Sequence, residues 1–405
     1  MIKVDDALAL VLSNVSPRAA VKVPLAEAQG LVLAEDMLSD LDMPPFDKSA
    51  MDGFAVIAAD TDKAPVELEI VEELPAGSVA KKPIGSGQAA KIMTGAAVLQ
   101  GADAVVMVED TEPGHKSSFV RVLKPVKKGK NICFKAEDMK RGDRVAAKGA
   151  VLRPQEIGVL AAVGAAEVLV HPAPSIAILS TGDELVKASE KPQPGQIRDS
   201  NSFSLRAQAL RLTPKVQVLG IARDKRAELQ RLIRKGLGHD IFILSGGISV
   251  GEFDLCGRVL KELGVNFFFE KVAIRPGRPT AFGKKDGTLV FALPGNPVSS
   301  LVTFELFVRP AVQKLMGCSR LGLPRVRASV TCPVAEKNGR TRFVPAVLRW
   351  SDGKWAVTPV EWHGSADIRG LTQANALMIL VEGVEKLSPG EQTEVLVLDE
   401  ADMGL

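Results

Sequence analysis

The chain has 405 residues, 46% of them hydrophobic, and a mean hydropathy of +0.12. This composition excludes an intrinsically disordered protein, and the length allows about two to four domains with their own cores. The 51 basic and 48 acidic residues are interspersed and leave a net charge of only +3, which argues against a nucleic-acid-binding face. We expect the short cluster of Lys124, Lys127, Lys128 and Lys130 to be a solvated turn.

The amino terminus and the cysteines predict a cytoplasmic protein. The first residues lack the basic segment and the long apolar segment of a signal peptide, and no apolar run reaches the length of a membrane span. The cysteines are isolated and form no CxxC pair, so neither a zinc site nor a disulfide framework is indicated. We expect them to be small buried hydrophobic residues in a reducing compartment. They are Cys133, Cys256, Cys318 and Cys332.

The first part of the chain changes from helical to β-rich patterns. Residues 4–14 and 24–36 predict two helices, after which Pro44 and Pro45 break regular structure. From residue 52 to about 145, Val-rich runs alternate with Pro/Gly turns, which is typical of an all-β module. Residues 153–164 then predict a capped helix with a proline near its start.

The second part begins with alternating strands and helices. Strands are predicted at 175–180, 216–221, 241–244 and 289–293, and helices at 201–211, 225–236, 255–263 and 297–316. This alternation is typical of a parallel sheet with helices on both faces. Short β runs return at 325–330, 355–360 and 393–398 and predict a small barrel or sandwich.

Ligands of an open parallel sheet bind beyond the carboxyl ends of its strands. Four strand-to-helix corners of this chain carry unusual residues, and the topology should place them along one edge of the sheet. They are residues 180–185, 223–224, 244–254 and 293–299.

The third corner favours anion binding most strongly. Gly246, Gly247 and Gly251 follow a buried strand together with Ser245 and Ser249, and glycines let backbone N–H groups approach an anion closely. At the fourth corner, Asn296 is a good N-cap and Pro297 suits the first helical position, so ordinary capping explains part of that pattern.

Carboxylates at the same corners predict a magnesium site. Glu184 and Asp254 both follow glycine-containing turns, and two or three carboxylates could hold the ion. Asp224 taken alone is interpreted as a helix cap.

A basic segment supplies the opposite charge. Lys271, Arg275 and Arg278 flank a rigid Pro-Gly pair and favour oxyanion binding over the alternative of a solvated loop. No Ser-His-Asp set and no nucleophilic cysteine can be assembled, so we expect a site for phosphate, carboxylate and cation chemistry without a covalent nucleophile.

The most distinctive run comes near the amino terminus. Residues 44–56 join two prolines to Asp47, Lys48 and Ser49 and to an Asp52-Gly53 turn that launches a strand. Read alone, the run would also suit a polar turn between two elements. It closely resembles the signature of the MoeA family, the molybdopterin molybdenumtransferases. Further motifs match this family in order over essentially the whole chain, at residues 93–96, 101–106, 180–185, 245–251 and 294–299.

The resemblance implies a fold class of α/β plus all-β modules, arranged as an elongated homodimer with active sites shared between protomers. It implies a two-segment N-terminal domain (1–45 and 140–173) and an inserted β module (46–139). A molybdopterin-binding α/β domain with a central parallel sheet (174–320) and a C-terminal β-barrel (321–405) would follow.

The resemblance also implies a transferase of molybdenum cofactor biosynthesis. The substrate would be adenylylated molybdopterin, and with Mg²⁺ the enzyme would cleave the phosphoanhydride, load molybdate onto the dithiolene sulfurs and release AMP. The expected catalytic residues are Asp52, Thr94, Asp138, Glu184, Asp224 and Asp254, of which the last three would hold Mg²⁺. Asp52 and Thr94 would come from the partner protomer.

The expected substrate-binding residues come from five stretches of the chain. They are Ser180, Thr181, Gly182, Ser245, Gly246, Gly247, Ser249, Gly251, Lys271, Arg275, Arg278, Pro294, Gly295, Asn296, Pro297, Ser299, Arg340 and Ser365. The sequence departs from the family pattern in having Arg275 and Arg278 where lysine is frequent, and Arg198 where an aromatic residue is common. Bulkier bidentate guanidinium groups put the affinity and selectivity for the oxyanion in question.

Two alternatives stay open at this point. The first is the adenylyltransferase that makes the activated pterin, whose fold resembles residues 174–320 alone; the second is a non-enzymatic scaffold of the same fold. The sequence does not distinguish molybdate from tungstate, which are near-isosteric and equally charged. Expected partners are a second protomer, the adenylyltransferase and molybdoenzyme chaperones, with no nucleic acid and no membrane.

Overall fold

The computed structural model describes residues 1–247, 255–335 and 339–399. The chain divides into two compact units. The larger unit contains Met1–Glu35, Lys148–Leu152 and Val168–Leu405, and the smaller contains Asp36–Ala147 and Arg153–Glu167. The chain therefore passes from the larger unit into the smaller one twice and returns each time. The division into four domains stays a prediction.

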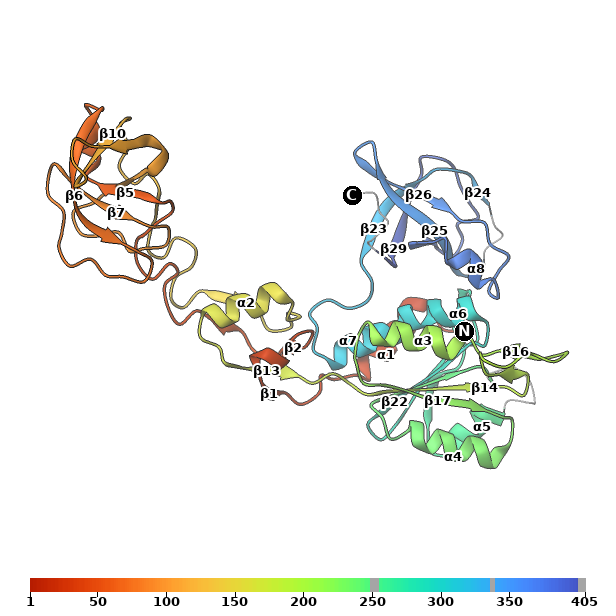
Figure 1. The fold of residues 1–405 in the computed structure, drawn as a ribbon. Helices are drawn as coiled ribbons and strands as arrows, with labels where there is room; N and C mark the ends of the chain where they lie inside the picture. The colour runs from red at the N-terminus through yellow and green to blue at the C-terminus, as the bar shows by residue number, and fades with distance from the viewer. Residues whose placement is uncertain (248–254, 336–338, 400–405) are drawn as a thin grey trace. The chain divides into compact units, whose positions relative to one another are not determined.

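A six-stranded sheet forms the centre of the larger unit (Figure 1). Its strand order is β17-β14-β18-β22-β21-β19; the first four strands are parallel, and β21 is antiparallel to both of its neighbours, β22 and β19. β14, β18 and β22 are buried at every residue, which explains their continuous apolar sequences. The strands are β14 (Ile176–Thr181), β17 (Val216–Ala222), β18 (Ile241–Ser245), β19 (Asn266–Phe269), β21 (Ala281–Lys285) and β22 (Thr288–Leu293).

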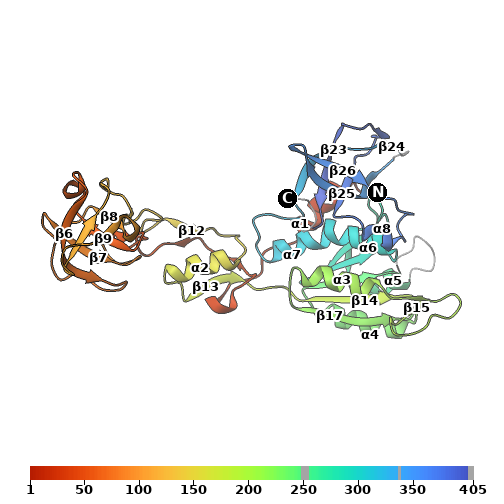
Figure 2. The ribbon, with the colours of Figure 1, turned by 45° about the horizontal axis from the view of Figure 1, so that its top comes forward.

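Helices cover both faces of this sheet, as predicted (Figure 1). On β14, Ile176 and Ile178 pack into one core with α1, α3, α6 and α7, whereas Ala177 and Leu179 pack into another with α4 and α5. Figure 2 shows α3 lying against β14 and β17. The helices are α1 (Val4–Ser13), α3 (Asn201–Leu210), α4 (Arg226–Gly236), α5 (Leu255–Glu262), α6 (Pro297–Thr303) and α7 (Arg309–Leu315).

The predicted continuous helix over 297–316 is interrupted. Between α6 and α7 the backbone forms a π-helical turn, η4 (Phe304–Val308). Pro310 has no N–H to donate to the carbonyl of Leu306, and such a gap favours a local change of helical pitch. Glu305 and Arg309 form a buried ion pair beside this turn.

The predicted helix over 24–36 is wrong. This segment forms β1 (Val21–Pro24), a short 3₁₀ turn η1 (Leu25–Glu27) and β2 (Val32–Leu33). Gly30 has a positive φ of 77°, which ends any helix there. The strands then pair with β13 (Glu167–His171) in a three-stranded sheet, so pairing with a distant segment overrides the local pattern.

The carboxyl-terminal part of the larger unit is a closed β-barrel. Five strands pair in the ring β25-β26-β23-β29-β27, and the pairing of β27 with β25 closes it. The strands are β23 (Arg325–Val330), β25 (Thr341–Ser351), β26 (Lys354–Pro359), β27 (Ala376–Leu380) and β29 (Gln392–Val397). The predicted barrel is confirmed. Accessory elements are β20 (Ile274–Arg275), which extends β25, the pair β24 (Val334–Ala335) and β28 (Lys386–Leu387), and α8 (Ile368–Leu371).

The smaller unit contains a second six-stranded sheet, as its Val-rich runs predict. Its order is β8-β5-β7-β6-β10-β9. Gly53 begins β5 where a Cβ would lie 1.9 Å from the carbonyl oxygen of Val106, so only glycine fits. The strands are β5 (Gly53–Val56), β6 (Val66–Leu74), β7 (Gln88–Ile92), β8 (Ala104–Met107), β9 (Thr111–Pro113) and β10 (Phe119–Val122), with turns η2 (Ala58–Thr61) and η3 (Val108–Asp110).

The predicted capped helix is α2 (Pro154–Ala162). The Glu156 carboxylate accepts hydrogen bonds from the backbone N–H and the guanidinium of Arg153. The Arg153 side chain is the main cause that lowers the pKa of Glu156 to about 2. Two short strand pairs complete this unit: β3 (Met37–Leu38) with β12 (Arg144–Ala146), and β4 (Lys48–Ser49) with β11 (Ile132–Cys133).

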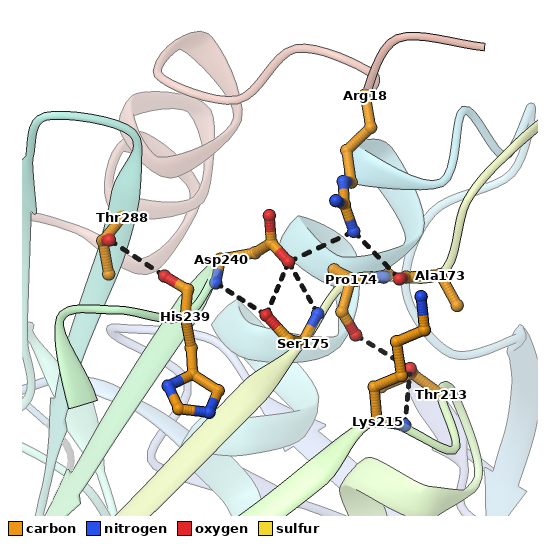
Figure 3. A network of polar contacts seen from close by, with 9 residues as sticks. All are labelled: Arg18, Ala173, Pro174, Ser175, Thr213, Lys215, His239, Asp240 and Thr288. Carbon is orange, nitrogen blue, oxygen red and sulfur yellow. Dashed lines mark hydrogen bonds and ion pairs between the residues drawn. The ribbon is translucent and has the colours of Figure 1, made fainter. Parts of the chain in front are cut away.

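A polar network joins the start of the central sheet to the segment that follows α1 (Figure 3). The Oδ2 atom of Asp240 accepts hydrogen bonds from the N–H and the hydroxyl of Ser175, both at 2.7 Å. Arg18 Nη1 lies 3.1 Å from the same oxygen and donates to the Ala173 carbonyl at 2.9 Å. This network aligns β14 with β18 at the amino ends of the strands.

Replacing Asp240 by alanine should therefore destabilise the larger unit. The Ser175 N–H and the Arg18 guanidinium would lose their acceptor, at a cost of about 1–3 kcal/mol in the free energy of unfolding. Urea denaturation measures this loss, with exposed Glu382→Ala as the control. Equal midpoints for the two variants would contradict the proposed alignment.

Candidate active site at the carboxyl edge of the parallel sheet

The strand register brings the predicted corners to one edge of the sheet. Ser180 of β14 lies beside Ser245 of β18, and Ser245 lies beside Leu293 of β22. On the other side of β14, Thr181 pairs with Ala222 of β17. Because the four strands are parallel, the segments that leave them start from the same side, as the sequence predicts.

The turn that leads into α3 connects three of these strand ends. The Asp199 carboxylate accepts from the Ser180 hydroxyl at 2.9 Å and from Ser202. Asn201 Nδ2 donates to Ser245 Oγ at 2.8 Å and to the Gly295 carbonyl at 2.7 Å. Asp199 and Asn201 are not among the site residues expected from the sequence. The signal was present, since four consecutive residues with capping side chains, 199–202, precede a helix.

A cavity of about 560 Å³ opens at this edge, and we call it the edge cavity. Thr181 Oγ1 and Asn201 Oδ1 are buried and have no hydrogen-bond partner within the described part of the chain. Buried polar atoms without partners are uncommon and point to a missing ligand or water. The lining residues are Ser180, Thr181, Glu184, Leu185, Ile197, Arg198, Asp199, Ser200, Asn201, Ser245, Gly246, Pro279, Pro294, Gly295, Asn296, Pro297, Ala366 and Ile368.

The glycine corner is tightly packed against β14. Gly246 and Gly247 have φ values of 87° and 67°, and a Cβ on Gly246 would lie 2.5 Å from the Thr181 carbonyl oxygen. Both positions therefore require glycine. Ser249, Gly251 and Asp254 lie outside the described residues, so their expected roles stay predictions.

Acidic side chains gather near Glu184, which lines the edge cavity. Burial raises the pKa of Asp224, and the nearby carboxylates of Asp183 and Glu184 raise it further. Glu184 folds back against Gly182, where the missing Cβ leaves room for its carboxylate. The interpretation of Asp224 as a helix cap is wrong, because Lys225 is the N-cap of α4. Instead the Asp224 N–H donates to Asp183 Oδ1 at 3.0 Å.

Asp183 is a residue that sequence reasoning missed, although it lies within the first corner. Within the described ranges, no group of three or more His, Cys, Asp or Glu side chains is close enough to hold a metal ion. The magnesium site that needs Asp254 accordingly stays a prediction.

Basic side chains gather around β20. Its register with β25 places Arg275 beside Arg342. Burial is the main cause that lowers the pKa of Arg342 to about 10, and the charge of Arg275 adds to this effect. Arg275 and Arg278 are exposed and Lys271 is half-buried. Arg340 immediately precedes β25, and Pro279 of the same basic segment lines the edge cavity.

Asn296 connects the fourth corner to the barrel. It is the N-cap of α6, but its side chain makes no capping hydrogen bond. Its Nδ2 instead donates to Ser365 Oγ at 2.8 Å, and the Ser365 carbonyl accepts from the Val298 N–H. Ser299 is buried within α6 and does not line the edge cavity.

A more apolar cavity of about 760 Å³ shares Asp199 with the edge cavity. Its lining includes Phe203, Val218 and Ile221 but lacks the glycine corner. We take the edge cavity as the candidate active site because Gly246 of the glycine corner, the carboxylates of Glu184 and Asp199 and the guanidinium of Arg198 line it.

Three predicted residues belong to the smaller unit. Asp52 Oδ1 accepts from the N–H and the hydroxyl of Thr94, each at 2.7 Å. These two bonds, the backbone bond first, lower the pKa of Asp52. Asp138 is exposed on a segment that bonds to Met43. The structure thus brings Asp52 and Thr94 together, while Asp138 lies on an adjoining segment.

Comparisons with known proteins cover nearly the whole chain. Residues 2–164 match the MoeA N-terminal region (domain I and II), 177–314 a probable molybdopterin binding domain, and 327–398 the MoeA C-terminal region (domain IV). A molybdopterin molybdenumtransferase of Staphylococcus aureus is 35% identical over 406 aligned residues, covering 99% of this chain and 96% of the relative. The chain belongs to the MoeA family.

Other MoeA relatives agree over a similar span. The molybdopterin molybdenumtransferase of Bacillus subtilis is 36% identical, covering 93% of this chain and 90% of the relative. The crystal structure of the molybdopterin biosynthesis moeA protein of Pyrococcus horikoshii OT3 superimposes with a TM-score of 0.82 at 32% identity, covering 98% of this chain and 100% of that one. Since the matches include the β modules as well as residues 177–314, they favour the transferase over an adenylyltransferase.

The hydrogen bonds between Asp52 and Thr94 lead to a prediction about the pKa of Asp52. Thr94→Ala keeps the backbone bond but removes the hydroxyl, so the pKa of Asp52 should rise part of the way towards 3.8. Because the pKa of Asp52 is lower in the folded than in the unfolded protein, its bonds with Thr94 stabilise the fold at pH values above the unfolded pKa. This stabilisation is lost as the pH falls through the folded pKa. NMR titration of the Asp52 carboxyl measures the shift, with Thr111→Ala as the control; an unchanged Asp52 titration would contradict the assignment.

Proposed function

We propose that this protein inserts molybdate into adenylylated molybdopterin, cleaving the phosphoanhydride and releasing AMP to form molybdenum cofactor. The observation that carries the proposal is the edge cavity, which is lined by Gly246, the carboxylates of Glu184 and Asp199 and the guanidinium of Arg198, in a chain that belongs to the MoeA family. The relatives named above are called molybdopterin molybdenumtransferases, and we assign the same activity here.

The donors around the edge cavity suit a diphosphate. The Gly246 N–H already donates to the Leu293 carbonyl at 3.2 Å, whereas the Gly247 N–H can approach a phosphate oxygen because no side chain intervenes. The hydroxyls of Ser180 and Thr181 and the amide of Asn296 add further polar groups on the same edge. These residues bind and orient the substrate, and they contribute no covalent nucleophile.

Mg²⁺ suits the acidic side chains near Glu184. Oxygen ligands are those that Mg²⁺ prefers, and the mutual repulsion among Asp183, Glu184 and Asp224 would be relieved by a cation. We propose that Glu184 and Asp224 hold the ion together with Asp254. When bound, Mg²⁺ supplies positive charge that stabilises the phosphate oxygens during cleavage.

The basic segment suits the molybdate dianion. Arg275 and Arg278 are exposed, and guanidinium groups recognise oxyanions through paired N–H donors. We propose that Lys271, Arg340 and Ser365 complete this subsite. The soft ligands of molybdenum come from the dithiolene of the pterin, so the activity needs no cysteine cluster.

We also propose a cytoplasmic location. None of the helices that the structure describes has the length and apolar composition of a membrane span. The cysteines are free thiols, and burial raises the pKa of Cys318 to about 11, which makes this thiol unreactive.

A turnover assay tests the proposed activity. Purified protein, adenylylated molybdopterin, molybdate and Mg²⁺ should release AMP, and chelation of Mg²⁺ should stop the release. Glu184→Gln and Asp224→Asn should each reduce the rate at least about 10-fold, because even outer-sphere partners of metal ligands have effects of this size. Exposed Asp6→Asn in α1 serves as the control.

Two results would contradict the proposed activity. Accumulation of adenylylated pterin from molybdopterin and Mg-ATP without molybdate would identify an adenylyltransferase. Pterin binding without AMP release under any of these conditions would identify a scaffold.

We further propose a homodimer in which Asp52 and Thr94 complete the site of the partner protomer. Three segments, around residues 44–52, 93–97 and 131–139, are hydrogen-bonded to one another around this pair. They carry four exposed apolar side chains, Phe46, Met51, Met93 and Phe134, with 41–47% of their surface accessible. Exposed apolar side chains of this kind favour a protein contact.

Mixing two inactive variants tests the shared site. Asp52→Asn alone and Asp224→Asn alone should be nearly inactive, whereas heterodimers of the two contain one intact site. An equal mixture, unfolded and refolded together, should recover about a quarter of the wild-type activity. A monomer in analytical ultracentrifugation, or an inactive heterodimer, would contradict this arrangement.

A further inference from the structure

The residues that touch Asn201 fix the orientation of its side chain. Asn201 is 8% exposed, and its side chain reaches both Ser245 and Gly295. The Gly295 carbonyl can only accept a hydrogen bond, so the atom facing it must be Nδ2 and not Oδ1. Nδ2 has two hydrogens, and the second is donated to Ser245 Oγ. Both hydrogens of the amide are therefore used to join the ends of two strands.

This orientation also determines what the Ser245 hydroxyl can do. Ser245 Oγ accepts from Asn201, so its own hydrogen stays available for an acceptor. Ser245 lines the edge cavity together with Asn201 and Gly295. An acceptor in this cavity, such as a phosphate oxygen, would receive that hydrogen without competition from the Asn201 amide.

The neighbouring residue Asp199 supports the same turn from the other side. Its carboxylate accepts from Ser180 at the end of β14 and from the hydroxyl of Ser202 at 2.6 Å. The turn before α3 is thus held to β14 by Asp199, and to β18 and the corner after β22 by Asn201. A side chain that contacts two corners at once sets the distance between them.

We propose that Asn201 is a positioning residue, which orients the Ser245 hydroxyl and the Gly295 corner for the phosphate part of the substrate. The proposal rests on the proposed function, since a phosphate-containing substrate must bind in the edge cavity. Asn201 itself acts through Ser245 and Gly295 and not on the reacting atoms.

Substitutions at Asn201 separate positioning from general packing. Asn201→Asp keeps the size of the side chain but places a carboxylate oxygen against the Gly295 carbonyl, and Asn201→Ala removes both hydrogen bonds. Each should lower kcat/KM by about 10²-fold, the loss expected when a binding group is displaced by about 1 Å. The control is Ser204→Ala in the first turns of α3, whose hydroxyl donates only to the Asn201 carbonyl.

A double-mutant cycle with Ser245→Ala supplies the decisive comparison. If Asn201 acts through Ser245, the double variant should lose no more than the worse single variant, because both changes remove the same Asn201–Ser245 hydrogen bond. The affinity for AMP, measured by calorimetry, should show the same non-additivity without any turnover. Additive losses, or Asn201 variants that keep wild-type kcat/KM and AMP affinity, would overturn the proposal.

The two readouts distinguish this proposal from the proposed function. A wild-type protein that binds AMP but releases none from the adenylylated pterin would refute the insertion activity, while the cycle in AMP affinity would still decide the role of Asn201. A wild-type protein that binds no AMP would overturn both. A loss of Tm in the Asn201 variants with unchanged AMP affinity would assign the residue to packing alone.

Discussion

The register of the four parallel strands is the constraint on which the site depends. Ser180, Ser245 and Leu293 lie side by side because β14, β18 and β22 are buried on both faces and bring different side chains to each helical layer. A slip of one residue would turn Ile176 and Ile178 towards the wrong helices. The apolar alternation that builds the core therefore also sets where each strand ends, and with it the position of every corner that follows. The Asp240 network holds this alignment at the opposite ends of the strands.

The corners at the carboxyl edge of the sheet place side chains of like charge close to one another. Burial is the main cause that raises the pKa of Asp224, and the nearby carboxylates of Asp183 and Glu184 raise it further. Burial likewise is the main cause that lowers the pKa of Arg342, and the charge of Arg275 beside it adds to this effect. Such repulsion costs stability and is typical of sites that bind charged ligands. The hydrogen bonds of Asp199 and Asn201 offset part of this cost. They join the carboxyl ends of β14 and β18 to the corner that follows β22. We infer that the fold tolerates like charges at this edge because the proposed Mg²⁺ would supply positive charge to the carboxylates and the anionic substrates would supply negative charge to the arginines.

Much of the larger unit was predictable from the sequence, since buried parallel strands and amphipathic helices leave strong local patterns. The corners at Gly246, Glu184 and Asn296 were predictable for the same reason: glycine, carboxylate and capping residues directly follow apolar runs. The failures have long-range causes. The local sequence of segment 24–36 favours a helix, but the positive φ of Gly30 and the pairing with β13 give it another structure. The local sequence also favours Asp224 as a helix cap, but its N–H donates to Asp183. The role of Asn201 depends on residues 44 and 94 positions away along the chain, which no local pattern records.

A crystal structure of the protein soaked with Mg²⁺, AMP and tungstate tests the central claim most directly, because tungsten can be located by its anomalous scattering. The account predicts the AMP phosphate in the edge cavity beside Ser245 and Gly295, and a tungsten peak near Arg275 and Arg278. A phosphate bound in the apolar cavity lined by Phe203 and Val218, with the edge cavity empty, would contradict it.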